Sequence, residues 1–148
     1  DEVVQGAVAE GLLEGGELSR LQTGIVAANL GWILARPETS AEAVELVDQA
    51  VQILGPISEL LDTRALVRLA HDQKILARED MRDAILVPSA QKYLHLAVVE
   101  AATDNLDAAA DALERSRSLG LESERLSADD AARLRSLERR LQSVARGS

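Results

Sequence analysis

The sequence predicts an all-α fold, and three observations support this prediction. Leu and Ala, which are strong helix formers, dominate the apolar residues, while aromatic residues make up only 1% of the 148 residues. Apolar residues recur at helical spacing, for example across residues 17–35. The three prolines, Pro37, Pro56 and Pro88, each lie where such a periodic segment breaks. Runs of β-branched and aromatic residues typical of strands are absent.

The individual helices are predicted from periodicity, capping residues and stop signals. Thr39 and Glu42 form a capping box that opens one helix, and Ser127 and Asp130 form a second at the last helix. Gly120 is a typical C-terminal stop. The short connections favour antiparallel neighbours packed in chain order. The predicted helices span about 2–14, 17–35, 39–54, 58–70, 75–86, 89–102, 106–119 and 127–145.

Composition and charge exclude several classes of protein. With no Cys and two His, the chain lacks the side chains for disulfides, thiolate clusters or a His-based metal site. No apolar run reaches the roughly 18 residues of a membrane-spanning helix, so no membrane partner is expected. The net charge is −9, and residues 1–62, with eleven acids and two arginines, hold all of it. This balance disfavours nucleic acid, which is bound through cations.

The start of the chain shows no targeting signal. Its first residue is Asp1 rather than an initiator Met, and no basic-then-apolar leader follows. We therefore expect a segment excised from a longer protein. The compartment stays open, with the cytoplasm preferred because no targeting signal is visible.

The chain repeats a helix pair at a period of about 34 residues. Four positions recur after 34 residues and again after a further 32, and the shorter offset places a two-residue deletion near Pro88. Small residues occupy the first two positions of every copy, as close crossing of two antiparallel helices requires. Because one pair cannot bury its apolar face alone, the copies are expected to stack. The aligned sets are Gly31, Ala65 and Ala97; Ala43, Ala77 and Ala109; Val47, Met81 and Leu113; and Ala50, Ala84 and Ser116.

This pattern resembles the tetratricopeptide repeat (TPR), in particular its bacterial members. The resemblance implies one domain, a right-handed α-solenoid of antiparallel helix pairs with a C-terminal capping helix. The signature positions matched in the first copy are Leu30-Gly31, Ala43, Val47, Ala50 and the Gly55-Pro56 turn. The implied repeats are 24–57, 58–89 and 90–123, with a partial repeat or N-terminal cap at 1–23 and the capping helix at 124–146.

The chain also departs from the family at several packing positions. Leu34, Arg68 and Glu100 stand where an aromatic residue is usual. Arg64 replaces the usual Leu of the second copy, and Ser116 replaces the last Ala of the third. These departures bear on how regularly the pairs stack.

In the resembled family, the first helix of each pair lines a concave groove that binds peptides or partner domains. The resemblance therefore implies a mostly apolar groove, with Trp32 as its anchor because large aromatic side chains dominate binding hot spots. The alternative is that Trp32 packs between the first two pairs. Some members of the family bind a C-terminal carboxylate with Lys and Asn side chains at fixed groove positions. Ala28 and Trp32 stand where that clamp needs Lys and Asn, so no carboxylate clamp is expected. The predicted groove residues are Ile25, Asn29, Trp32, Arg36, Asp62, Leu66, Leu69, Leu94, His95 and Val98.

The sequence holds no arrangement typical of an enzyme. Phosphate-binding loops, nucleophile elbows and metal-binding signatures are absent, so no catalytic residue, cofactor or metal is expected. His71 is interpreted as part of a helix end, and His95 lacks a partner nucleophile. Asp80 and Asp83 share a helix face and are expected to be surface charges.

Three functions stay open at this point. The expected one is a non-catalytic module that binds a protein or peptide, including another domain of the parent chain. The second is a structural spacer in a longer solenoid. The third is an enzyme, which would require a buried carboxylate–His pair with strongly shifted pKa values.

Overall fold

The computed structural model describes residues 40–147, and this part of the chain is all-helical, as predicted. Its helix ends agree with the prediction to within two residues. The predicted helices at 2–14 and 17–35, and with them Ile25, Asn29, Trp32 and Arg36, lie outside the described residues. The elements are α3 (Ser40–Leu54), α4 (Ser58–Ala70), α5 (Lys74–Ala84), α6 (Ala90–Ala102), α7 (Leu106–Ser118), the 3-10 turn η2 (Ser123–Arg125) and α8 (Ala128–Gly147).

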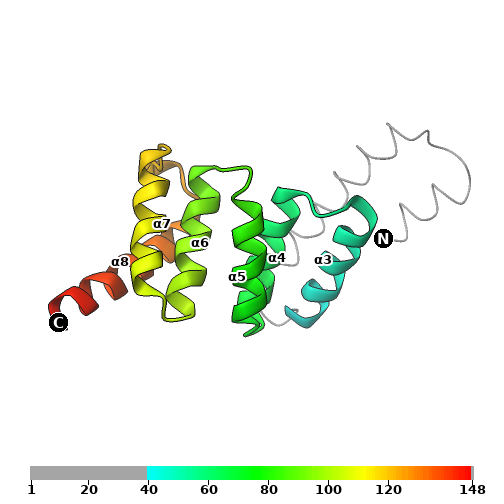
Figure 1. Ribbon diagram of the computed structural model, residues 1–148, viewed down its shortest axis with the longest axis horizontal. Helices are drawn as coiled ribbons and strands as arrows, with labels where there is room; N and C mark the ends of the chain where they lie inside the picture. The colour runs from blue at the N-terminus through cyan, green and yellow to red at the C-terminus, as the bar shows by residue number, and fades with distance from the viewer. Residues whose placement is uncertain (1–39, 148) are drawn as a thin grey trace, which may run out of the picture.

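The helices α3 to α7 lie side by side in chain order (Figure 1). Each packs against the next, and α4 also contacts α6 two positions further along. Helix α8 breaks this order, because after η2 it returns to pack against α6 and runs obliquely to the row (Figure 1). None of the helices within residues 40–147 is long and apolar enough to cross a membrane.

Local sequence signals set the helix ends. The Ser89 hydroxyl accepts a hydrogen bond from the Lys92 amide at 3.1 Å, and the Ser127 hydroxyl accepts one from the Asp130 amide at 3.1 Å. Gly120 follows α7 with a φ of +94°, which favours glycine. Ser58 is the first residue of α4, and Ile57 precedes it without a side-chain cap.

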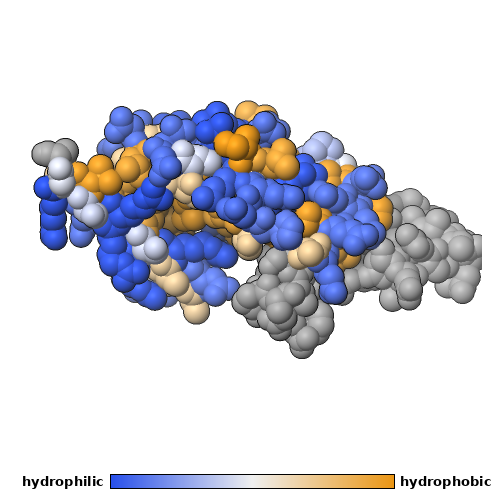
Figure 2. Space-filling model, turned by 90° about the horizontal axis from the view of Figure 1, so that it is seen from below, coloured by the Kyte–Doolittle hydropathy of each residue, from blue (hydrophilic) through white to orange (hydrophobic). Residues whose placement is uncertain are grey.

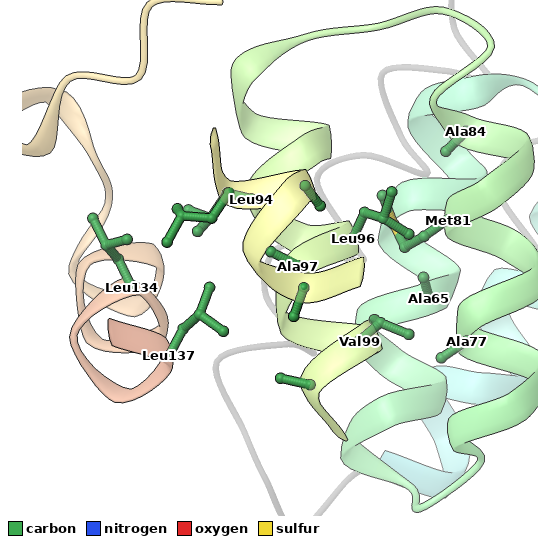
Figure 3. Packing of buried hydrophobic residues seen from close by; sticks show 14 of the residues in the cluster. Ala65, Ala77, Met81, Ala84, Leu94, Leu96, Ala97, Val99, Leu134 and Leu137 are labelled. Carbon is green, nitrogen blue, oxygen red and sulfur yellow. The ribbon is translucent and has the colours of Figure 1, made fainter. Parts of the chain in front are cut away.

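The small residues of the repeat pattern are the core of the structure. Ala65, Ala77, Ala97 and Ala109 are each 0% exposed. Figure 3 shows Met81 beside Leu96 in the space between neighbouring pairs. Burial of alanine at these positions lets the helix backbones approach closely, so the packing depends on the absence of larger side chains there.

A buried carboxylate joins α4 to α5. Asp80 is 3% exposed and accepts hydrogen bonds from Arg64 (Nε at 2.9 Å, Nη2 at 2.8 Å) and from Arg68 (Nη1 at 2.8 Å). The interpretation of Asp80 as a surface charge is therefore wrong, whereas Asp83 is exposed as expected. Asp80 is buried because two guanidinium groups replace the water that it loses.

The other departures from the TPR pattern are also polar links between helices. Glu100 of α6 is 2% exposed and accepts a hydrogen bond from Arg82 of α5 at 3.1 Å. The Ser116 hydroxyl of α7 donates to the Ala90 carbonyl at 2.5 Å. Together with Arg64 and Arg68, these residues place paired polar side chains where the resembled family uses small or apolar ones.

Replacing Asp80 by Ala is predicted to destabilise the chain by about 3 kcal/mol. It leaves Arg64 and Arg68 partly buried with the more exposed Asp48, at 3.4 Å and 3.5 Å, as their remaining carboxylate partner. Urea denaturation followed by circular dichroism measures this change. Asp83→Ala, on the same helix but exposed, is the matched control and should change stability by less than about 0.5 kcal/mol. Equal effects of the two substitutions would contradict the structural role of Asp80.

Replacing Ala97 by Leu is predicted to lower the free energy of unfolding by about 1–3 kcal/mol, because a fully buried crossing position has no room for three more carbons. Ala110→Leu, at an exposed position of α7, is the control and should be near neutral. Thermal unfolding of both variants checks the prediction. A stabilised Ala97→Leu variant would show that the helix backbones are not in close contact here.

Candidate functional site

The predicted groove of the third copy is covered by the chain's own C-terminal helix. Leu134 and Leu137 of α8 pack toward Leu94 of α6 (Figure 3). As a result Leu94 is 0% exposed and His95 is 2% exposed. Both were predicted to contact a partner; with α8 in place neither side chain is accessible to one. The physical reason is that α8 buries its own leucine stripe on this surface.

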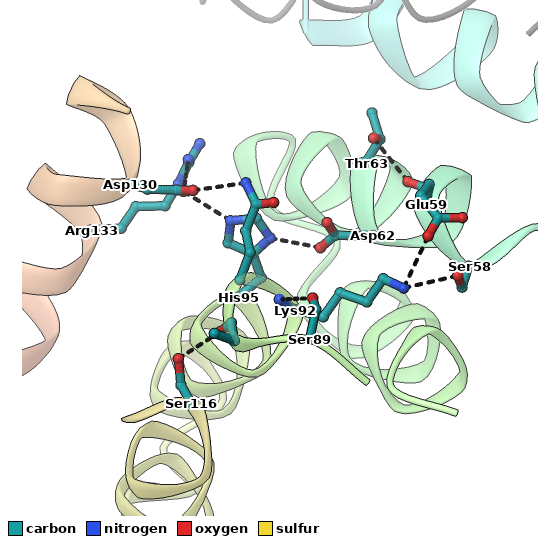
Figure 4. A network of polar contacts seen from close by, with 12 residues as sticks. Ser58, Glu59, Asp62, Thr63, Ser89, Lys92, His95, Ser116, Asp130 and Arg133 are labelled. Carbon is teal, nitrogen blue, oxygen red and sulfur yellow. Dashed lines mark hydrogen bonds and ion pairs between the residues drawn. The ribbon is translucent and has the colours of Figure 1, made fainter. Parts of the chain in front are cut away.

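His95 is the centre of a polar network that joins three helices (Figure 4). Its Nδ1 lies 2.6 Å from Oδ1 of Asp62 on α4, and its Nε2 lies 2.8 Å from Oδ1 of Asp130 on α8. Ionised carboxylates only accept hydrogen bonds, so this geometry requires a proton on both ring nitrogens. Burial acts to lower the pKa of His95, but the hydrogen bonds that its ring donates to Asp130 and Asp62 outweigh burial and raise the pKa to about 9.

Asp130 is held by donors from two helices. Besides His95, the amide Nε2 of Gln91 donates to its Oδ2 at 3.1 Å, and Nη1 of Arg133 donates to its Oδ1 at 2.8 Å. Burial acts to raise the pKa of Asp130, but the hydrogen bond and charge of His95 outweigh it, so the pKa lies well below its usual range. The cluster therefore pairs two cations, His95 and Arg133, with two carboxylates, Asp62 and Asp130.

A second polar link joins α4 to α6 beside this network. Lys92 is 5% exposed, and its Nζ donates to the Ser58 hydroxyl at 2.9 Å, the Val87 carbonyl at 2.7 Å and Oε1 of Glu59 at 3.2 Å. Figure 4 shows Lys92 and His95 reaching from α6 toward the same helix, α4. The two links connect α4 and α6 through polar side chains at two places.

Part of the predicted groove remains open. Leu66 and Leu69 lie one and two turns after Asp62 on the same face of α4, and Val98 lies one turn after His95 on α6; all are partly exposed. Figure 2 shows a hollow with apolar residues inside a hydrophilic surround on the lower side of the molecule. A cavity of about 200 Å³ between α6 and α8 is lined by Val98, Ala101, Ala102, Arg133, Ser136, Leu137 and Arg140.

Sequence reasoning did not identify Asp130 or Lys92 as part of this site. Asp130 was recognised only as the capping-box partner of Ser127, a role that its amide plays. Its side chain pairs with a histidine 35 residues earlier, and no local pattern signals that contact. Four arginines of α8, Arg133, Arg135, Arg139 and Arg140, are predicted from the sequence to form its outer face. Arg135 and Arg139 are exposed, whereas Arg133 pairs with Asp130 and Arg140 donates to the Ala101 carbonyl of α6.

The buried carboxylate–His pair is the feature that an enzyme would require, so its chemistry matters. A general base needs a free lone pair on nitrogen at working pH. Both nitrogens of His95 carry protons that carboxylates accept, so the ring offers no lone pair at neutral pH. Among residues 40–147, no group of three or more His, Asp or Glu side chains is placed to hold a metal ion.

Comparisons with known proteins identify no relative of this chain. No protein-family model, curated protein or solved structure matches it.

The stability of the fold is predicted to fall as the pH rises from about 6.5 to about 9. The pKa of His95 is raised from 6.5 to about 9, so its contribution is complete below pH 6.5 and is lost as the pH rises through that range. The loss is on the order of 3 kcal/mol. The pKa of Asp130 is lowered from 3.8, so the stability that its carboxylate contributes is lost as the pH falls below about 4. Maximum stability is thus expected between about pH 4 and 6.5.

Urea denaturation at a series of pH values measures this profile. The His95→Gln variant should be less stable at pH 6 and should lose most of the decline toward pH 9. His71→Gln, which alters an exposed histidine, should keep the wild-type profile. A decline that persists in His95→Gln would assign the pH dependence to other groups.

Proposed function

We propose that the chain is a non-catalytic, TPR-like helical-repeat module that binds a peptide or protein segment on the concave surface formed by α4 and α6. Three features support a right-handed solenoid of helix pairs. Alanines spaced at the repeat offset are buried at 0% exposure, neighbouring helices pack in chain order, and α4 contacts α6. Stacked pairs require these three features together.

The observation that carries the binding role is the apolar surface left open beside the His95 network. Leu66, Leu69 and Val98 keep partial exposure on the faces of α4 and α6 that point the same way as Asp62 and His95. Apolar side chains grouped in a hollow with polar groups at its edge are typical of a peptide-binding site. The favoured ligand presents two or more apolar side chains from a helix or an extended segment.

The placement of α8 favours this role over that of a spacer. A spacer would present its last pair for a further pair to stack on. Here α8 packs instead against α6, and its outer face carries the exposed Arg135 and Arg139. An enzyme is disfavoured because both ring nitrogens of His95 are protonated and hydrogen-bonded to carboxylates, which leaves no lone pair for a general base. Nucleic acid stays disfavoured by the net charge of −9.

The Leu66→Glu variant is predicted to lose peptide binding. Peptides are selected from a random library on the immobilised full chain, and their affinities are then measured by calorimetry. A buried charge in the groove should weaken binding at least about tenfold. Leu76→Glu, which places the same charge at a 42% exposed position on α5, should bind within about twofold of the wild type.

Both variants should retain the helical spectrum and thermal midpoint of the wild type. Equal binding to both variants would place the peptide elsewhere on the molecule. Failure to select any peptide would remove the proposed binding role of this surface.

A further inference from the structure

We propose that α8 is a displaceable internal ligand, and that the surface of α6 beneath it is a binding site for a partner helix that carries a carboxylate followed by leucines four and seven residues later. This inference rests on the proposed function, because it names the partner class for the same concave surface. In the present structure Asp130, Leu134 and Leu137 of α8 supply that spacing.

The surface of α6 contains all the groups needed to recognise such a helix. His95 Nε2 and Gln91 Nε2 point at one carboxylate, at 2.8 Å and 3.1 Å from its two oxygens. Leu94 lies next to them and receives the leucines of α8 (Figure 3). A charged donor, an amide donor and an apolar contact on one helix face give both specificity and burial.

The receptor side of this contact is also held by groups outside α8. Asp62 of α4 binds His95 Nδ1 at 2.6 Å, which fixes the ring and supports its positive charge. Lys92, one turn before His95, is tied to Ser58 and to the Val87 carbonyl of the same body. A preorganised receptor loses little entropy on binding, so a second helix could use the site as α8 does.

Further polar contacts of α8 involve side chains at its surface. Arg140 donates to the Ala101 carbonyl of α6 at 2.5 Å and pairs with Asp104, and Glu138 pairs with Arg117 of α7 at 3.0 Å. The contacts that α8 makes with Gln91, Leu94 and His95 of α6 come from its carboxylate and its leucines.

The connection 119–127 keeps α8 close to α6 and so makes it a strong competitor of a separate partner helix for the same site. A tether of this length gives an effective concentration on the order of millimolar. A partner must therefore make additional contacts, and the open side chains of Leu66, Leu69 and Val98 lie next to the site to supply them. The covered and open parts of the groove then act as one binding surface.

The test uses a fluorescein-labelled peptide of residues 126–147 added to the full chain, with binding read by anisotropy. In the wild type, the internal α8 occupies the site and the peptide should bind weakly. Asp130→Asn in the chain should free the site and tighten binding at least about tenfold. Asp129→Asn, an exposed neighbour with the same change of charge, should have no effect. Leu134→Ala in the chain provides a second way to release α8.

Two further arms test the recognition chemistry. Adding His95→Gln to the Asp130→Asn chain should abolish the gain in peptide affinity. A peptide that itself carries Asp130→Asn should not bind to the Asp130→Asn chain. The inference is overturned if Asp130→Asn and Leu134→Ala both leave peptide binding unchanged, or if both peptides bind equally. It is also overturned if the released chain sediments as a dimer, since a second copy would then be the occupant. Selected peptides that need Leu66 but leave α8 bound would uphold the proposed function alone.

Discussion

The protonated imidazole of His95 connects the repeated helices to the helix that covers them. It lies between a carboxylate on α4 and a carboxylate on α8, and each ring nitrogen donates to one of them. A charge buried this deeply is stable only if it is paired on every polar side. The position of α8, the charge of His95 and the closure of the third groove segment therefore depend on one another.

The same principle extends through the row of helices. Asp80 between two arginines, Glu100 beside Arg82, and Lys92 between α4 and α6 are all buried and paired. In this chain, which has few aromatic residues, alanines pack closely in the core and directional polar contacts set how neighbouring helices are oriented. Such contacts specify one arrangement of helices, because a sliding or rotated neighbour would leave a buried charge without its partner.

These contacts also decide which side chains of the proposed binding surface are accessible. The donors of Gln91 and His95 and the apolar side chain of Leu94 are occupied by α8, whereas Leu66, Leu69 and Val98 stay partly exposed. Binding in the open part and release of α8 from the covered part are coupled if a ligand spans both. The strength of that coupling equals the difference in its affinity for the two states of α8.

Between residues 40 and 147, the sequence by itself determined the helices, their ends to within two residues, and the buried alanines. These depend on local propensity, on caps such as Ser89 and Ser127, and on the period of the alanines. Tertiary structure alone decided that Asp80 is buried and that α8 returns to α6. The pairs involved are 16 and 35 residues apart, and a charged residue has the same local signal whether its partner is water or a distant side chain. Burial depends on that partner, which only the folded chain brings into place.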